Sequence, residues 1–307
     1  MRIAPIMHLK EHTKPVSITI GADPEFILLT ATVPKSTSKL SFNNYEPRPI
    51  TGLLGGTKAK PIAVHPDYPN YMMQEDNVMA ELNVPAASSG KELFRSVELG
   101  KRLMLNNIIP KLLGCHVAWS DSCVGKFPVD VLKTPEAQRF GCDPDFDAYN
   151  DGAKCDPVVI AKGDKYEERY AGGHIHVGWS ELPNIPSNVL AMFVEAYAYL
   201  PYMMYDMQGG RRATYGAAGR YRPKPYGIEY RTPSNFWTYD RNLGTGLLDA
   251  ILCAARGLAY LDQDYLIHAY NTIPWEDIKT AINTSNTTDA STLYSYIDNE
   301  FPIGVRG

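Results

Sequence analysis

The sequence has no long apolar run, no excess of basic residues and no cysteine pair of a recognised type. No apolar segment reaches the roughly 18 residues that a membrane span requires, and no charged-then-apolar leader opens the chain. We therefore expect a cytoplasmic protein without a membrane partner. The formal net charge is -4, and without a basic field we expect no nucleic-acid partner either.

Motifs for nucleophilic catalysis are also missing. The five cysteines are odd in number and show no C-x-x-C spacing, which argues against a disulfide framework and a cysteine zinc site. No G-x-S-x-G motif is present. Cys115 is followed directly by His116, and adjacent side chains of a strand point to opposite faces. Serine or cysteine nucleophiles are therefore not predicted.

The remaining composition is that of an ordinary globular protein. With 44% hydrophobic and 21% charged residues, a chain of 307 residues can bury a substantial core. We find no internal repeat, low-complexity tract or linker. We therefore expect a single domain over residues 1–307.

The most informative stretch, residues 171–179, contains two histidines in an alternating pattern. His174 and His176 share one parity with glycines, whereas the other parity is apolar. Successive side chains of a strand point to opposite faces, so both imidazoles are expected on one side of a sheet. Gly172 and Gly173 leave the backbone open to close approach by a ligand or another strand. From this stretch alone, a metal and phosphate site and a pair of structural histidines are equally good interpretations.

Residues 16–28 form a second alternating segment. Asp23 and Glu25 occupy its polar face, opposite a row of apolar residues. Pro24 lies between the two acids, and proline in a strand fits only an edge or a bulge. A proline between the two acids therefore favours a binding or catalytic site over a regular structural strand.

Two more segments repeat this design. Residues 71–84 are predicted as one strand with the polar positions Glu75, Asn77, Glu81 and Asn83 on one face. Residues 227–234 place Glu229 and Arg231 together, directly after a loop rich in glycine and arginine. The basic residues of that loop are Arg211, Arg212, Arg220, Arg222 and Lys224.

Two loops could also contribute to a site. Residues 51–58 contain a Gly-Gly-Thr-Lys turn without P-loop spacing; a plain hairpin turn is the favoured interpretation, and an anion site is the alternative. Residues 133–157 have an acidic centre that fails the EF-hand pattern, because the sixth and twelfth positions from Asp143 are Ala148 and Lys154. We expect a surface loop or lid there.

Apolar spacing and capping residues predict the helices. Ser88 or Ser89 caps a helix that runs to Gly114, with Pro110 bending or shortening its last turn. Further helices are predicted at residues 187–207, 241–261, 275–282 and 291–299.

If the four polar strands pair in one antiparallel sheet, about five carboxylates, two imidazoles and an arginine cluster share one concave surface. Like charges in low dielectric repel unless cations neutralise them, so this pattern predicts divalent metal. Carboxylate-rich ligation suits Mg2+ or Mn2+ better than zinc. Arginines beside such metals are suited to a triphosphate.

Three segments carry a family resemblance: G-A-D-P-E-F from Gly21, G-G-H-I-H-V-G from Gly172 and I-E-Y-R-T-P-S from Ile228. In this order they resemble the phage-encoded amidoligases, a branch of the carboxylate-amine ligase superfamily that includes glutamine synthetase and glutamate-cysteine ligase. The resemblance implies an α+β fold like the glutamine synthetase catalytic domain, with helices on the convex face of a cupped, mainly antiparallel sheet. Asp23 departs from the pattern, since many relatives carry glutamate there.

The resemblance also implies residue roles. One metal site beside the accepting carboxylate would use Glu25, Glu81 and Glu75, and a second beside the ATP phosphates would use Asp23, His174 and Glu229. The implied phosphate contacts are His176, Arg220, Arg222 and Arg231. The expected catalytic residues are Glu25, Glu81 and Arg231.

The implied activity is an ATP-dependent carboxylate-amine ligase with Mg2+ or Mn2+ as cofactor. A substrate carboxylate attacks the terminal phosphate, and an amine displaces phosphate from the resulting acyl phosphate to form an amide or peptide bond. We expect small-molecule or peptide substrates. Sheet ligases of this type often assemble, which keeps a homo-oligomer open beside a monomer. The alternatives are a metal-dependent hydrolase with His174, His176 and Glu229 as ligands, and a phage interaction protein without turnover.

Overall fold

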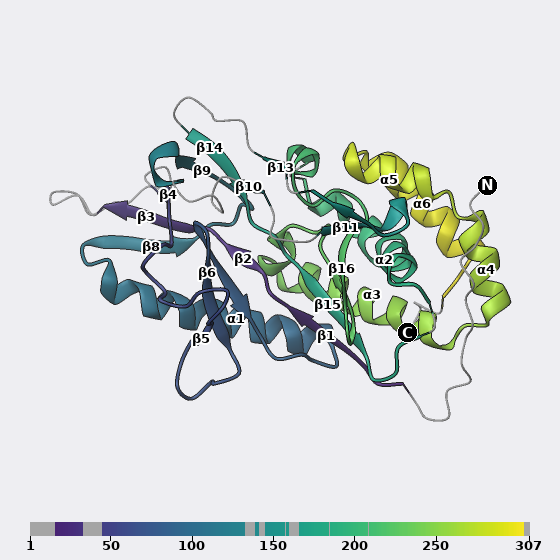
Figure 1. The fold of residues 1–307 in the computed structure, drawn as a ribbon, viewed down its shortest axis with the longest axis horizontal. Helices are drawn as coiled ribbons and strands as arrows, with labels where there is room; N and C mark the ends of the chain where they lie inside the picture. The colour runs from purple at the N-terminus through teal and green to yellow at the C-terminus, as the bar shows by residue number, and fades with distance from the viewer. Residues whose placement is uncertain are drawn as a thin grey trace.

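The computed structural model describes residues 16–32, 45–132, 139–140, 145–156, 158–159, 166–183, 185–207 and 209–303. These residues form a mixed α+β fold in which all paired strands are antiparallel (Figure 1). The α+β class predicted from the sequence is confirmed at this level.

The described strands form several sheets. The largest contains, in spatial order, β1 (Ile18–Ala22), β15 (Ile175–Trp179), β17 (Gly227–Tyr230), β16 (Arg220–Lys224), β11 (Asp145–Asp147) and β12 (Ala153–Cys155). A four-stranded sheet contains β2 (Glu25–Phe26), β7 (Met79–Asn83), β6 (Met72–Asp76) and β5 (Ile62–Ala63). A three-stranded sheet contains β4 (Glu46–Arg48), β3 (Leu28–Thr32) and β8 (Cys115–Trp119). The two-stranded sheets are β14 (Tyr166–Tyr170) with β9 (Val124–Pro128), and β10 (Arg139–Phe140) with β13 (Val158–Val159).

The polar strands lie in two sheets, so the expectation of a single sheet is wrong. β1, β15 and β17 belong to the six-stranded sheet, whereas β2 and β7 belong to the four-stranded one. The division falls at Pro24, which has no N–H to continue a strand ladder. The Glu25 N–H still donates to the Gly172 carbonyl at 2.9 Å, and the Leu82 N–H donates to the Pro24 carbonyl at 3.1 Å. The two sheets therefore remain hydrogen-bonded where they meet.

The predicted strand at residues 71–84 is a hairpin. β6 and β7 are antiparallel neighbours with a two-residue turn between them. Asn77 begins this turn with a φ of 56°, a left-handed conformation that asparagine tolerates better than most residues. The turn changes the phase of alternation, so Asp76, and not Glu75, shares a face with Glu81.

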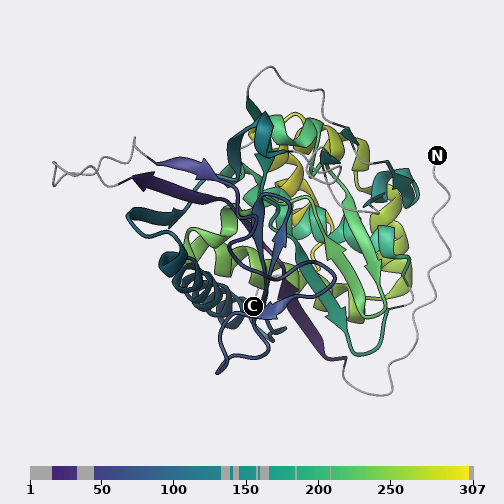
Figure 2. The same cartoon turned by 60° about the vertical axis from the view of Figure 1, so that its left-hand side comes forward.

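Helices cover one side of the largest sheet, as Figures 1 and 2 show. The described α-helices are α1 (Gly90–Ile108), α2 (Ser187–Val194), α3 (Arg241–Tyr260), α4 (Gln263–Thr272), α5 (Trp275–Asn283) and α6 (Thr287–Glu300). α2 contacts β16 and β17, and α3 contacts β1 and β15. By length and composition α3 could also cross a membrane, but half of its apolar window is buried inside the protein, as expected for a core helix.

Several helix boundaries differ from the prediction. Ser89 caps α1 as expected, and a 3-10 turn that contains Pro110 follows its end at Ile108. α2 is shorter than predicted and continues as a π-helical turn, η5 (Glu195–Tyr199), and a 3-10 turn, η6 (Leu200–Tyr205). Pro201 cannot donate a backbone hydrogen bond there. α4 was not predicted, although Asp262 caps its first turn.

The loop predicted at residues 133–157 is only partly described. β11 and β12 lie within it and extend the six-stranded sheet. Asp143 lies outside the described residues.

The glycine pair before β15 is needed for close packing. Gly173 donates its N–H to the Pro233 carbonyl at 3.1 Å. A Cβ at Gly173 would lie 2.1 Å from the Ser234 carbonyl oxygen and 2.7 Å from Trp237 Nε1. The expected close approach is therefore made by another segment of the chain, which holds the histidine strand against the segment after β17.

We expect Gly173→Ala to lower the free energy of unfolding by about 1–3 kcal/mol, the usual cost of overpacking a tight site. Gly210→Ala is a matched control, because a Cβ there would meet no atom within 4 Å. Thermal unfolding of both variants measures the difference. Equal melting temperatures would contradict the assigned role of Gly173.

Candidate active site

Acidic and basic side chains from both polar sheets line one cavity of about 150 Å³. The acids are Asp23, Glu25, Asp76, Glu81 and Glu229, and the basic residues are Lys58, Arg169, His174, Arg222, Lys224 and Arg231. Most of these acids are deeply buried, with Glu25, Glu81 and Glu229 at most 6% exposed. The polar residues predicted from three separate parts of the sequence therefore meet in one place.

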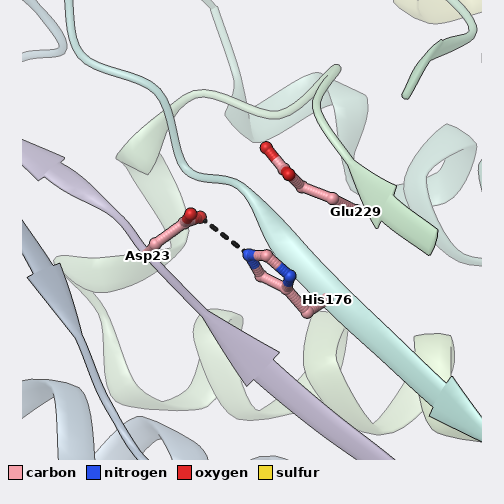
Figure 3. Close-up of side chains that lie close together, drawn as sticks. All are labelled: Asp23, His176 and Glu229. Atoms are coloured by element: carbon pink, nitrogen blue, oxygen red, sulfur yellow. Dashed lines mark ion pairs between the residues drawn. The ribbon is translucent and has the colours of Figure 1, made fainter. Parts of the chain in front are cut away.

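Asp23, His176 and Glu229 form the first potential ligand set, which we call group A. Their ligand atoms lie within 4.8 Å of one another. Figure 3 shows the three side chains approaching from neighbouring chain segments, with Asp23 Oδ1 3.1 Å from His176 Nε2. The register of the sheet explains this arrangement, because His176 pairs with Gly21 on one side and with Glu229 on the other.

Glu25, Asp76 and Glu81 form the second set, group B. Their carboxylate oxygens also lie within 4.8 Å of one another, and all three residues are buried. Glu25 and Glu81 are direct partners in the antiparallel pairing of β2 and β7. Like charges in such positions destabilise a sheet. The pairing therefore has an electrostatic cost that plain strand formation does not explain.

The carboxylates of group A are held in the charged form. Burial raises the pKa of Glu229, but Arg231, His174 and Arg222 together outweigh burial and bring that pKa to about 2. Burial likewise opposes ionisation of Asp23, and the neighbouring His176 and His174 lower its pKa well below the usual range. Burial also opposes charge on His176, yet the Asp23 carboxylate raises the pKa of that imidazole.

The carboxylates of group B have the opposite tendency. Burial and the nearby Asp76 raise the pKa of Glu25 to about 7. Burial, Asp23 and Asp76 raise the pKa of Glu81 well above its usual value. Lys58 lowers both values only partly, with its Nζ 3.8 Å from Asp76 Oδ2. Group B therefore lacks enough positive charge for all three carboxylates to ionise together unless a cation binds.

Arg231 is the central cation of the cavity. Its guanidinium bonds to Glu229, and its Nε lies 2.6 Å from Asp145 Oδ1. Lys224 Nζ lies 2.7 Å from Glu229 Oε2, and Arg222 Nη1 lies 3.3 Å from Glu229 Oε1. Three basic side chains thus converge on Glu229, a buried carboxylate of group A.

Arg220 lies apart from this cluster. It does not line the cavity, and its guanidinium contacts the Cys155 sulfur. Alternation along β16 places Arg220 and Arg222 on one face but about 6–7 Å apart along the strand. The expected phosphate contact of Arg220 therefore has no support in the geometry.

The two histidines have different surroundings. His174 is buried, its Nε2 lies 2.6 Å from Tyr215 Oη, and its Nδ1 lies 3.2 Å from an Arg231 nitrogen. Burial and Arg231 lower the pKa of His174. His176, which was expected to contact phosphate, completes group A instead of His174. His174 Nδ1 is nevertheless 3.6 Å from Asp23 Oδ1, so it supports the same carboxylate.

Glu75 has a structural role in place of the expected metal ligation. Its two carboxylate oxygens accept hydrogen bonds from the N–H groups of Gly52, Leu54 and Gly55 at 2.9–3.0 Å. The glycine-rich turn therefore does present N–H groups to an anion, but that anion is the side chain of Glu75. Lys58, from the same turn, lines the cavity.

Several site residues were missed from the sequence. Asp76 could have been found from the two-residue hairpin turn, because Asn77 is a residue that favours such turns. Asp145 and Tyr215 have no comparable local signal, since their positions depend on long-range packing against Arg231 and His174.

The donor sets fit a hard divalent cation. Group B offers only carboxylate oxygens, and group A offers two carboxylates and an imidazole, as Mg2+ and Mn2+ sites commonly do. In group A, Asp23 Oδ1 and Glu229 Oε2 are buried oxygens that contact basic side chains, His176 and Lys224 respectively. A cation bound by group A would therefore share these oxygens with the basic side chains that contact them.

We expect Asp76→Asn to weaken Mn2+ binding by at least about tenfold, because it removes a charged ligand from group B. Glu75→Gln on the same hairpin should keep the Mn2+ affinity but lower the melting temperature, since it weakens hydrogen bonds to three backbone donors. Calorimetric Mn2+ titration and thermal unfolding measure the two effects. The opposite pattern would show that Glu75, and not Asp76, is the ligand.

Comparison with known proteins gives one family match. The model of the phage phiEco32-like COOH.NH2 ligases, type 2, matches residues 151–273. No curated protein matches the chain. The matched segment contains His174, His176, Glu229 and Arg231, whereas the acids of group B lie before it. The resemblance is therefore confirmed for the motifs that begin at Gly172 and Ile228: over residues 151–273 the chain matches a family of phage-type carboxylate-amine ligases.

Proposed function

We propose that the protein is an ATP-dependent carboxylate-amine ligase that forms an amide or peptide bond through an acyl phosphate. The family match supports a ligase that joins carboxyl and amino groups. The use of ATP, divalent metal and an acyl phosphate is our inference from the site. The main support is that the carboxylates of groups A and B, four of the five buried, line one cavity together with Arg231, Arg222 and Lys224.

The charge distribution suits a phosphoryl group held between the two groups. Arg231, Arg222 and Lys224 lie at group A, where they neutralise Glu229 and can also face phosphate oxygens. Group B lines the same cavity and has Lys58 as its neighbouring cation, with Nζ 3.8 Å from Asp76 Oδ2. We therefore place the ATP phosphates beside group A and the substrate carboxylate beside group B.

Both sets of residues fit Mg2+ or Mn2+. Asp23, His176 and Glu229 would hold one ion, and Glu25, Asp76 and Glu81 would hold another. When bound, such ions would screen the phosphate charge and the substrate carboxylate, so that two anions can approach each other.

The reaction then proceeds in two steps. A substrate carboxylate oxygen bonds to the terminal phosphorus of ATP, the bond from that phosphorus to the bridging oxygen breaks, and ADP leaves. The amine nitrogen next bonds to the acyl carbon, the bond to phosphate breaks, and the amine loses a proton. Arg231 is placed to stabilise charge on the transferring group, and Glu25 or Glu81 is placed to accept the amine proton.

A metal-dependent hydrolase has less support. That hypothesis needs His174, His176 and Glu229 to share one ion, but His174 directs its two nitrogens to Tyr215 and Arg231. It also gives no role to the buried acids of group B. A binding protein without turnover would have no reason to retain these unfavourable carboxylates.

We expect ATP and Mg2+ together to raise the melting temperature more than either alone, because the nucleotide binds as a metal complex. Differential scanning fluorimetry with each component measures this effect. The absence of any shift at millimolar ATP and Mg2+ would argue strongly against the proposed function.

Glu81→Gln and Glu229→Gln, one from each group, should reduce ADP release on the order of 100-fold, because each removes a carboxylate that would hold a cation against the phosphate charge. Glu98→Gln is a matched control on the surface, where Glu98 pairs with Arg241. ADP release is measured with amino acids, polyamines and short peptides offered in pairs. Activity at the wild-type rate in both site variants would place the reaction elsewhere.

A further inference from the structure

Glu195 is a fully buried carboxylate outside the cavity. It begins the π-helical turn η5, and its side chain lies on the helical side of the six-stranded sheet. Such turns within a helix often occur where a side chain must be placed at a particular point. The proposed reaction makes no use of Glu195, although burying a carboxylate is costly unless donors surround it.

Four groups donate hydrogen bonds to Glu195. Tyr230 Oη and Thr232 Oγ1 both donate to Oε1 at 2.8 Å. Tyr149 Oη donates to Oε2 at 2.8 Å, and the Gly219 N–H lies 2.9 Å from both oxygens. The carboxylate therefore joins β17, the residue before β16 and the 3-10 turn that follows β11.

The two donors to Oε1 are the residues on either side of Arg231. In an extended chain, Tyr230 and Thr232 point to the face opposite Arg231. One carboxylate oxygen therefore fixes both neighbours of the residue whose guanidinium bonds to Glu229 and Asp145. The Arg231 N–H also donates to the Arg220 carbonyl at 2.8 Å, next to Gly219. Glu195 thus restrains Arg231 in two ways, through its neighbours Tyr230 and Thr232 and through Gly219 just before β16.

We propose that Glu195 is a positioning residue, which orients the Arg231 guanidinium in the cavity by holding Tyr230 and Thr232 from behind the sheet. This inference rests on the proposed function only for its kinetic consequence. Its structural consequence, a fixed Arg231, can be tested without any assumed reaction.

The least disruptive test removes two hydrogen-bond donors to Glu195 and leaves the Glu195 carboxylate in place. The double variant Tyr230→Phe with Thr232→Val loses both bonds to Glu195 Oε1. Tyr197→Phe is a matched control on the same π-helical turn, because it loses a buried hydroxyl bond of 2.6 Å to the Phe301 carbonyl. This bond joins Tyr197 to Phe301 and not to β17, so its loss should leave Arg231 in place.

Crystal structures of both variants give the first readout. We expect the Arg231 guanidinium to lose its contacts with Glu229 or Asp145 in the double variant and to keep them in Tyr197→Phe. An unmoved Arg231 in the double variant would overturn the proposal, even if the protein proved to have no ligase activity.

ADP release gives the second readout. At temperatures where both variants are folded, we expect the double variant to reduce kcat about tenfold or more, with a smaller change in the KM for ATP. Tyr197→Phe should change the melting temperature but keep kcat within about twofold. Equal kcat in the two variants would mean that the Glu195 network only stabilises the fold. Failure of wild-type protein to release ADP would refute the proposed function and leave the structural readout to decide the role of Glu195.

Discussion

Repulsion among five neighbouring carboxylates, four of them buried, is the constraint on which the rest of this structure depends. Asp23, Glu25, Asp76, Glu81 and Glu229 line one small cavity. A folded chain gains no stability from this arrangement, because each charge loses hydration and repels its neighbours. The protein offsets the cost at group A with histidines and with Arg231, Arg222 and Lys224. At group B the cost remains, and the raised pKa of Glu25 and Glu81 is its direct expression.

The backbone is arranged to maintain this unfavourable grouping. Pro24 ends one sheet and allows the next to begin, so that Asp23 and Glu25 serve different groups while only one residue separates them. The close contact at Gly173 holds the histidine strand in place. Glu75 secures the turn that carries Lys58, and Glu195 secures the two residues on either side of Arg231. Two buried or half-buried acids outside the cavity thus support basic residues inside it.

The sequence predicted the residue types of the site better than their arrangement. Alternation identified Asp23, Glu25, His174, His176 and Glu229, because strands with one polar face leave a period-two pattern. Alternation failed at residues 71–84, where a hairpin turn exchanged Glu75 for Asp76. It also could not distinguish His174 from His176, since both lie on the same face and their roles depend on contacts with Tyr215 and Arg231.

The division into two sheets could not be predicted from the alternation of polar and apolar residues, because alternation does not show which strands pair. Pro24 indicated an interruption, but the strands on either side of it, β1 and β2, pair with segments more than fifty residues away. The ends of α2 and the existence of α4 were missed for related reasons. In both places weak local signals, Pro201 and the capping Asp262, act together with tertiary packing.

The most direct test of the account is a crystal structure with Mn2+ and a non-hydrolysable ATP analogue, read by anomalous scattering. We predict one manganese peak among Asp23, His176 and Glu229, a second among Glu25, Asp76 and Glu81, and the terminal phosphate beside Arg231. Density for manganese and nucleotide only at the protein surface, with both acidic groups empty, would contradict the central claim that these carboxylates are gathered to hold cations.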